Sequence, residues 1–365
     1  MHGVPHADGV LTDGGVIAWA GHGAPPERAD EEIVLEPGEL LAPGFVDLQV
    51  NGFAGRDAAE GRDAIAAISA ALPATGVTAF LPTLISSPVA TGAEFAGAVA
   101  TAEAHGARVL GAHIEGPFIN PSFRGAHDRN LLAVPTPDQV EVIARARPRL
   151  ITLAPELPGA LEAVARFRRA GIVVSAGHTG ADFEQGRKAV DAGVRFGTHI
   201  FNAMPPVHHR RPGIALALML DRRVTVGLIA DGEHVHPAVI RELIAVKGAA
   251  RVAMTTDQTA AAGAGAGSYQ LSGRTVHSDG MVVRLEDGTL AGSASIMEDL
   301  VRRAAAIPGL NVEKAVSMAS TVPARVLGEK QLGRIAEGAC ADLVVLDREQ
   351  RVRLTMVNGR VRFRR

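Results

Sequence analysis

Two short apolar segments end on histidine: residues 172–178 end on His178, and residues 194–199 end on His199. Both are rich in β-branched or aromatic residues, and residues 181–192 between them have the pattern of a helix closed by glycine. A strand, a helix and a second strand form a βαβ unit, whose strands are parallel. Functional groups of parallel α/β proteins lie at the carboxyl ends of the strands. We therefore expect both histidines to lie close together at the same edge of the sheet, as the ligands of a metal site do.

The same strand–helix alternation extends over most of the chain. The eight candidate strands are residues 45–50, 77–82, 109–115, 150–154, 172–178, 194–199, 224–230 and 251–256. Most are followed by an amphipathic helical pattern, and eight such units indicate an α/β fold, a closed (β/α)8 TIM-like barrel. A doubly wound sheet would need a phosphate-binding fingerprint after its first strand, and residues 51–55 do not supply one.

Both ends of the chain have short strand-like segments. They are residues 15–20, 32–35, 341–346 and 353–361. The pair Asn358-Gly359 inside the last of them predicts a tight hairpin. Neither end is long enough to form a stable domain alone. We therefore predict one small β-sandwich domain from residues 1–42 and 333–365, with residues 43–332 inserted as the catalytic barrel.

Composition restricts the class of function. The chain has 365 residues, 47% of them hydrophobic, and a formal net charge of −2, so a large core is possible and electrostatic binding of nucleic acid is not expected. The single cysteine, Cys340, excludes an internal disulfide framework and a cysteine zinc site. No run reaches the ~18 apolar residues of a membrane span, and residues 1–10 lack the pattern of a signal peptide. We expect a cytoplasmic protein that acts on a small molecule.

Charged residues stand at the ends of other predicted strands. Glu115 ends the third strand, and Asp257 follows the eighth. Taken singly, a strand-end histidine could be a hydrogen-bonded structural group and Asp257 a helix cap, but parallel strands buried on both faces are almost wholly apolar. Two imidazoles and one carboxylate are typical of catalytic zinc, which lowers the pKa of water to ~7. With Asp257 to accept a proton, the sequence predicts metal-assisted hydrolysis of a carbonyl or related bond.

These motifs resemble those of the amidohydrolase superfamily and, within it, the N-acetylglucosamine-6-phosphate deacetylases. The segments that carry the resemblance are residues 43–52, 113–118, 125–127, 175–178, 198–205, 230–234, 256–257 and 288–293. The resemblance itself covers nearly the whole chain. Each motif is moderately specific, and their joint order is highly specific.

The resemblance implies hydrolysis of the N-acetyl group of N-acetylglucosamine 6-phosphate, an amino-sugar phosphate, by a homodimer. It assigns Glu115, His178 and His199 as metal ligands. Asp257 is the implied proton acceptor and donor, and His127 the group that polarises the acetyl carbonyl. The implied substrate-binding residues are Ala126, His127, Asn202, Ala203, Arg210, His234, Leu290, Ala291 and Gly292. Alternatives are another N-acetylhexosamine phosphate such as N-acetylgalactosamine 6-phosphate, another amide, and, more remotely, a non-catalytic binding scaffold.

Two positions depart from the wider superfamily. Many amidohydrolases bind a second metal through a His-x-His pair on the first strand, where this chain has Gln49 and Asn51. Amides are poor ligands for borderline-soft ions. We therefore treat the pair as a possible remnant of a second site and expect one divalent ion per subunit, zinc, with iron, cobalt or manganese also suited. Arg210 would supply charge for a phosphate monoester, in its own or the neighbouring subunit.

Overall fold

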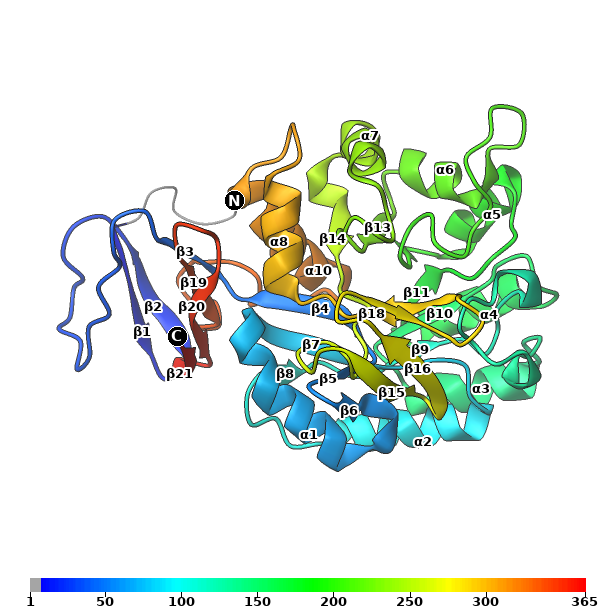
Figure 1. Ribbon diagram of the computed structural model, residues 1–365, viewed down its shortest axis with the longest axis horizontal. Coiled ribbons are helices and arrows are strands. Elements are labelled where there is room, and N and C mark those ends of the chain that lie inside the picture. Colours follow the sequence, from blue (N-terminus) through cyan, green and yellow to red (C-terminus); the bar gives the residue numbers. More distant parts are fainter. Residues whose placement is uncertain (1–7) are drawn as a thin grey trace.

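The computed structural model describes residues 8–365, and a barrel of strands and helices makes up its larger part (Figure 1). The eight parallel barrel strands are β4 (Phe45–Val50), β7 (Val77–Leu84), β9 (His113–Glu115), β10 (Leu150–Leu153), β11 (Val173–Ala176), β12 (Phe196–Gly197), β13 (Thr225–Leu228) and β14 (Val252–Met254). They are hydrogen-bonded in chain order. At the seam, Val50 bridges Gln258, which follows β14. The predicted TIM-like barrel is confirmed.

The barrel strands lie where the sequence predicts them, although most are shorter. β4 has the predicted bounds, whereas β12 keeps only the centre of the predicted segment 194–199. The prediction of one continuous strand over residues 109–115 is wrong. This segment is divided into β8 (Arg108–Val109) and β9, because Gly111 between them turns the chain with φ 125°.

Ten α-helices are present in residues 8–365. They are α1 (Arg62–Ala71), α2 (Val89–Ala100), α3 (Pro137–Ala146), α4 (Ala160–Arg169), α5 (Phe183–Ala192), α6 (Gly213–Leu220), α7 (Pro237–Lys247), α8 (Met297–Ala305), α9 (Val312–Ala319) and α10 (Thr321–Val326). α3 begins at Pro137 with a capping box, in which Thr136 and Gln139 each accept the other's backbone N–H. Asp182 and Gln185 start α5 in the same way. No helix in this part of the chain is long and apolar enough to cross a membrane.

An antiparallel sheet that the sequence analysis did not predict lies at the carboxyl end of the barrel. Its strands are β15 (Gly267–Leu271), β16 (Arg274–Ser278), β17 (Val282–Arg284) and β18 (Leu290–Ser293). The buried face includes Leu271, Val276 and Ala291. These side chains pack with Ile85, which follows β7, and with Ala126. The sheet therefore covers the loops that leave the barrel strands.

Strands from both chain ends share one antiparallel sheet beside the barrel (Figure 1). Its strands are β3 (Leu40–Pro43), β19 (Leu343–Leu346), β20 (Val352–Val357) and β21 (Arg360–Arg364). Asn358 and Gly359 form the predicted hairpin turn, both with positive φ. Two short hairpins complete the strands: β1 (Gly9–Asp13) with β2 (Val16–Gly21), and β5 (Gly52–Phe53) with β6 (Arg56–Asp57).

The N-terminal segment departs from expectation in two places. Residues 32–35 are not a strand, and residues 9–13, for which no strand was predicted, form β1. Residues 1–7, part of the segment searched for a signal peptide and of the predicted small domain, lie outside the described residues. The domain boundaries at 42/43 and 332/333 stay a prediction.

A chain of hydrogen bonds crosses the barrel interior next to the predicted metal ligands. His113 Nδ1 lies 3.1 Å from the carbonyl of Leu48, which can only accept, so this nitrogen carries the proton. Burial lowers the pKa of His113 to about 4, which keeps the ring neutral and makes Nε2 an acceptor. Thr152 Oγ1 donates to it at 2.8 Å, Thr198 Oγ1 to Thr152 at 2.7 Å, and Ser175 Oγ to Thr198 at 2.5 Å. The chain links strands that carry Glu115 and both site histidines.

Replacing Thr198 by valine is expected to lower the free energy of unfolding by about 1–3 kcal/mol, because two buried hydroxyls lose their partner. The measurement is the denaturant midpoint. Thr198→Ser, which keeps the hydroxyl, is the matched control and should cost less. Equal stability of Thr198→Val and wild type would mean that the chain adds nothing to the fold.

Candidate metal-dependent active site

Glu115, His178 and His199 meet at the carboxyl end of the barrel. Glu115 Oε1 lies 3.2 Å from His178 Nε2 and 3.1 Å from His199 Nε2, and the two nitrogens are 3.1 Å apart. A tetrahedral ion with bonds of ~2.0–2.1 Å would hold its ligands about 3.3 Å from one another. The triangle of donor atoms is therefore of the right size and chemistry for one divalent ion.

The two histidines present the same ring nitrogen to the site. His178 Nδ1 donates to the carbonyl of Phe123 at 2.9 Å, so its Nε2 lone pair faces the triangle. His199 Nδ1 is buried and has no partner within residues 8–365. Burial lowers the pKa of His199, but the hydrogen bond and charge of Glu115 outweigh it and raise the pKa in the absence of an ion.

The backbone at three site residues is left-handed. His178 has φ 51°, His199 27° and Asp257 50°, and each lies just past the end of its strand. Residues other than glycine seldom adopt such φ values, and those that do are enriched at functional sites. The chain turns sharply at these residues as it leaves the barrel. Nothing in their local sequence predicts this conformation.

His127 is a competing candidate for the third ligand, since it, Glu115 and His178 also cluster closely. Its Nδ1 accepts the backbone N–H of Ser86 at 3.1 Å and lies 2.7 Å from Ser86 Oγ. Burial, followed by the charge of His178, lowers the pKa of His127 to about 4, so the ring is neutral and its proton is on Nε2. That nitrogen is 3.7 Å from Glu115. A protonated Nε2 donates a hydrogen bond and cannot bind a metal.

Asp257 is buried beside the metal-ligand triangle. Its Oδ1 accepts a 2.8 Å hydrogen bond from Asn51 Nδ2, which leaves Oδ2 free of this bond. Burial raises the pKa of Asp257 to about 6 in the absence of an ion; the charge of Glu115 adds to the rise, and His199 and His234 oppose it. A buried carboxylate of this kind is suited to take up and release a proton.

Glu115 stays ionised. Burial raises its pKa, but hydrogen bonds with His127, His178 and His199 outweigh burial and hold the pKa well below its usual range. Gln49 Nε2 also donates to Glu115 Oε2, at 3.1 Å. A charged carboxylate is the form that binds a metal.

His234 lies on the loop after β13 and is fixed by Asp231. Asp231 Oδ2 is 2.6 Å from His234 Nδ1, and Asp231 Oδ1 accepts the backbone N–H of His234 at 2.9 Å. Burial raises the pKa of Asp231, but the bond with His234 outweighs it and lowers the pKa. The ring therefore keeps Nε2 available to a ligand. The sequence analysis singled out His234 but not the orienting role of Asp231.

The other predicted substrate-binding residues lie on loops at the carboxyl end of the barrel and on strand β18 of the antiparallel sheet. Arg274 donates to the carbonyl of Ala126 and so ties the loop of His127 to the antiparallel sheet. Ala203 has φ 50°, and its carbonyl accepts the N–H of Thr179. The remaining members are Asn202, whose amide donates to the carbonyls of residues 199 and 200, and Leu290, Ala291 and Gly292 in β18.

Arg210 is not brought to the metal-ligand triangle by any contact in the described chain. It is exposed in the loop before α6, and its guanidinium lies 2.8 Å from His209 Nε2. His208 accepts the backbone N–H of Arg210. The loop is thus held by its own side chains, and the cationic group is exposed on its surface.

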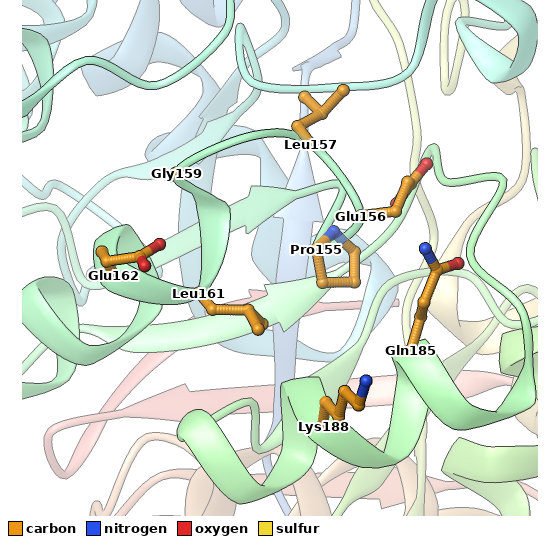
Figure 2. A pocket seen from close by; sticks show the side chains of 8 residues that line it. All are labelled: Pro155, Glu156, Leu157, Gly159, Leu161, Glu162, Gln185 and Lys188. Atoms are coloured by element: carbon orange, nitrogen blue, oxygen red, sulfur yellow. The ribbon is translucent and has the colours of Figure 1, made fainter.

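Glu156 is a partly buried residue that supports the segment after His178 and that the sequence analysis missed. It accepts hydrogen bonds from Thr179 Oγ1 at 2.5 Å and from the N–H of Gly180 at 2.6 Å, directly after His178. It also borders a surface pocket of about 250 Å³ with Gln185 and Lys188 of α5 (Figure 2). No sequence pattern pointed to it, because the contact depends on folding.

A (β/α)8 barrel with a Glu-His-His cluster and a buried aspartate at the strand ends defines a metal-dependent hydrolase. The model of the protein family described as "Amidohydrolase family" matches residues 40–362 of this chain. The chain belongs to the amidohydrolase family.

Individual relatives confirm the resemblance to the N-acetylglucosamine-6-phosphate deacetylases. N-acetylglucosamine-6-phosphate deacetylase of Bos taurus is 38% identical, over 88% of this chain and 83% of its own. N-acetylgalactosamine-6-phosphate deacetylase of Escherichia coli O157:H7 is 35% identical, over 88% of each chain. Among solved structures, the chain is similar to an N-acetyl-D-glucosamine-6-phosphate deacetylase from Mycobacterium smegmatis, an aspartate mutant in complex with N-acetyl-D-glucosamine 6-phosphate. The two chains superpose with a TM-score of 0.90 and are 36% identical, and the match covers 97% of this chain and 94% of the other.

Proposed function

We propose that this chain hydrolyses N-acetylglucosamine 6-phosphate to glucosamine 6-phosphate and acetate. The observation that carries the proposal is the triangle of Glu115, His178 and His199 with Asp257 and His127 beside it. The similarity to the deacetylases supports the substrate class.

The side chains have separate roles in this proposal. Glu115, His178 and His199 would hold one divalent ion, zinc, whose chemistry is to activate water and polarise a carbonyl oxygen. Asp257 accepts a proton from the attacking water as the new C–O bond forms, and then gives it to the departing amine as the C–N bond breaks. His127 Nε2–H donates to the acetyl oxygen as negative charge develops on it.

Substrate recognition would use the surrounding loops. In this proposal Asn202, Ala203 and His234 would contact the sugar phosphate, and Leu290, Ala291 and Gly292 would contact the substrate near its acetyl end. Arg210 would pair with the phosphate, in its own or the neighbouring subunit. The homodimer and the cytoplasmic location stay predictions.

The test is acetate release from N-acetylglucosamine 6-phosphate, compared with unphosphorylated N-acetylglucosamine. We expect strong preference for the phosphorylated sugar. No acetate from either sugar by the metal-loaded protein would contradict the proposal.

Arg210→Gln should raise KM for the phosphorylated substrate about 10- to 100-fold, the equivalent of a charge-assisted hydrogen bond of ~1.5–3 kcal/mol. Turnover of the unphosphorylated sugar should not change. Arg211→Gln, next in the same exposed loop, is the control. Equal effects of the two variants would assign the phosphate to another group.

N-acetylgalactosamine 6-phosphate is the second candidate substrate, because one relative of similar identity carries that activity in its name. The two sugars differ only in the configuration of one ring hydroxyl. The ratio of kcat/KM for the two phosphates decides between them.

A further inference from the structure

We propose that Gln49 and Asn51 are positioning residues that each bind one oxygen of a site carboxylate and thereby assign the other oxygen to its task. Gln49 acts on Glu115, and Asn51 acts on Asp257. This inference rests on the proposed function and deepens it. It gives a present role to two side chains that the sequence suggested only as remnants of a second metal site.

Asn51 is anchored on the barrel seam. Its backbone N–H donates to the carbonyl of Gln258 at 2.9 Å, and its own carbonyl accepts the N–H of Ala58 at 2.7 Å. The side chain is 2% exposed, and its Nδ2 donates to Asp257 Oδ1 at 2.8 Å. Because one carboxylate oxygen is held by a fixed donor, the proton transfers fall to Asp257 Oδ2.

Gln49 divides the oxygens of Glu115 in the same way. Its Nε2 donates to Oε2 at 3.1 Å, whereas Oε1 is the oxygen within 3.2 Å of both His178 and His199. Gln49 is held in turn, because its backbone N–H donates to Asp47 Oδ1 at 3.2 Å. Oε1 is therefore the oxygen oriented toward a metal ion.

The chemistry of the amide suits this task. A carboxylate only accepts hydrogen bonds, so each amide must turn its NH₂ group toward it. A lysine would hold the carboxylate equally well but would add a full positive charge and reduce its basicity. The neutral amides position Glu115 and Asp257 without neutralising them. Asn51 Oδ1, buried and without a partner in residues 8–365, remains an acceptor beside Asp257.

The test separates metal affinity from turnover in two variants. Gln49→Leu should weaken metal binding about 10- to 100-fold, as loss of a partner that orients a ligand does, with kcat largely retained at saturating metal. Asn51→Leu should lower kcat about 10- to 100-fold, since small misplacement of a reacting group has effects of this size, with metal affinity unchanged. Metal affinity is measured by chelator competition, without substrate.

Gln258→Leu is the matched control, because this amide is also buried at the seam but neither of its side-chain polar atoms has a partner in the described residues. It should leave both readouts near wild type. If the leucine variants do not fold, Gln49→Ala and Asn51→Ala, which introduce no bulk, carry the same comparison.

The inference is overturned if metal affinity is unchanged in the Gln49 variant, or if both variants lose the same parameter. Failure of the proposed function has a different signature, namely no acetate release by the wild-type protein. The metal-affinity comparison remains valid in that case.

Discussion

Replacement of Asp257 by asparagine should lower kcat for acetate release about 10²- to 10⁴-fold, the usual contribution of a general acid–base. The amide has nearly the same shape but cannot take up the proton of the attacking water or return it to the amine. Metal content should stay at the wild-type level, because the three donor atoms of Glu115, His178 and His199 are intact. Acetate release and elemental analysis of the same sample measure both.

Asp138→Asn, an exposed aspartate in the first turn of α3, is the control for removal of a negative charge. It should leave turnover unchanged. Full activity of Asp257→Asn would refute the assigned role. Loss of the metal together with activity would instead place Asp257 among the ligands.

Removal of the metal should have the second large effect. An ion that supplies about 4 kcal/mol of transition-state stabilisation accounts for a rate factor of ~10³, so chelation should reduce turnover at least that far. Zinc, cobalt, manganese or iron added back should restore it. The metal should also raise the melting temperature, because it binds only the folded site.

Glu115→Gln is the protein-side counterpart of chelation, since it removes the charge of one ligand and keeps its shape. We expect weaker metal binding and no increase in melting temperature at metal concentrations that stabilise the wild type. A chelator already saturated with zinc serves as the control. Undiminished turnover in a sample shown by elemental analysis to be free of metal would contradict a metal-dependent reaction.

The fold could be predicted where buried segments have an apolar sequence. Barrel strands such as β14 are continuous runs of buried apolar residues, so their positions follow from apolar composition. The sheet β15–β18 was not predicted, because exposed polar residues dominate strands such as β15. Residues 32–35 show the opposite error: an apolar segment without a pairing partner does not form a strand.

The site was predictable only in its residue types. Strand-end positions identified Glu115, His178 and His199, and the structure places their donor atoms together. The proton position on His127 depends on Ser86, 41 residues earlier in the chain, and such a contact has no local signal. Contact between Arg210 and a substrate likewise depends on the conformation of the exposed loop before α6, which has no local signal in the sequence.

The left-handed backbone at His178, His199 and Asp257 has a consequence for protein engineering. An ordinary side chain in this conformation costs roughly 1–2 kcal/mol relative to glycine, so the folded chain gives up stability at each of these residues to aim a functional group. A selection that scores thermal tolerance alone would therefore favour glycine at all three and enrich robust, inactive variants. Directed evolution of this enzyme for heat resistance must select for turnover in the same round.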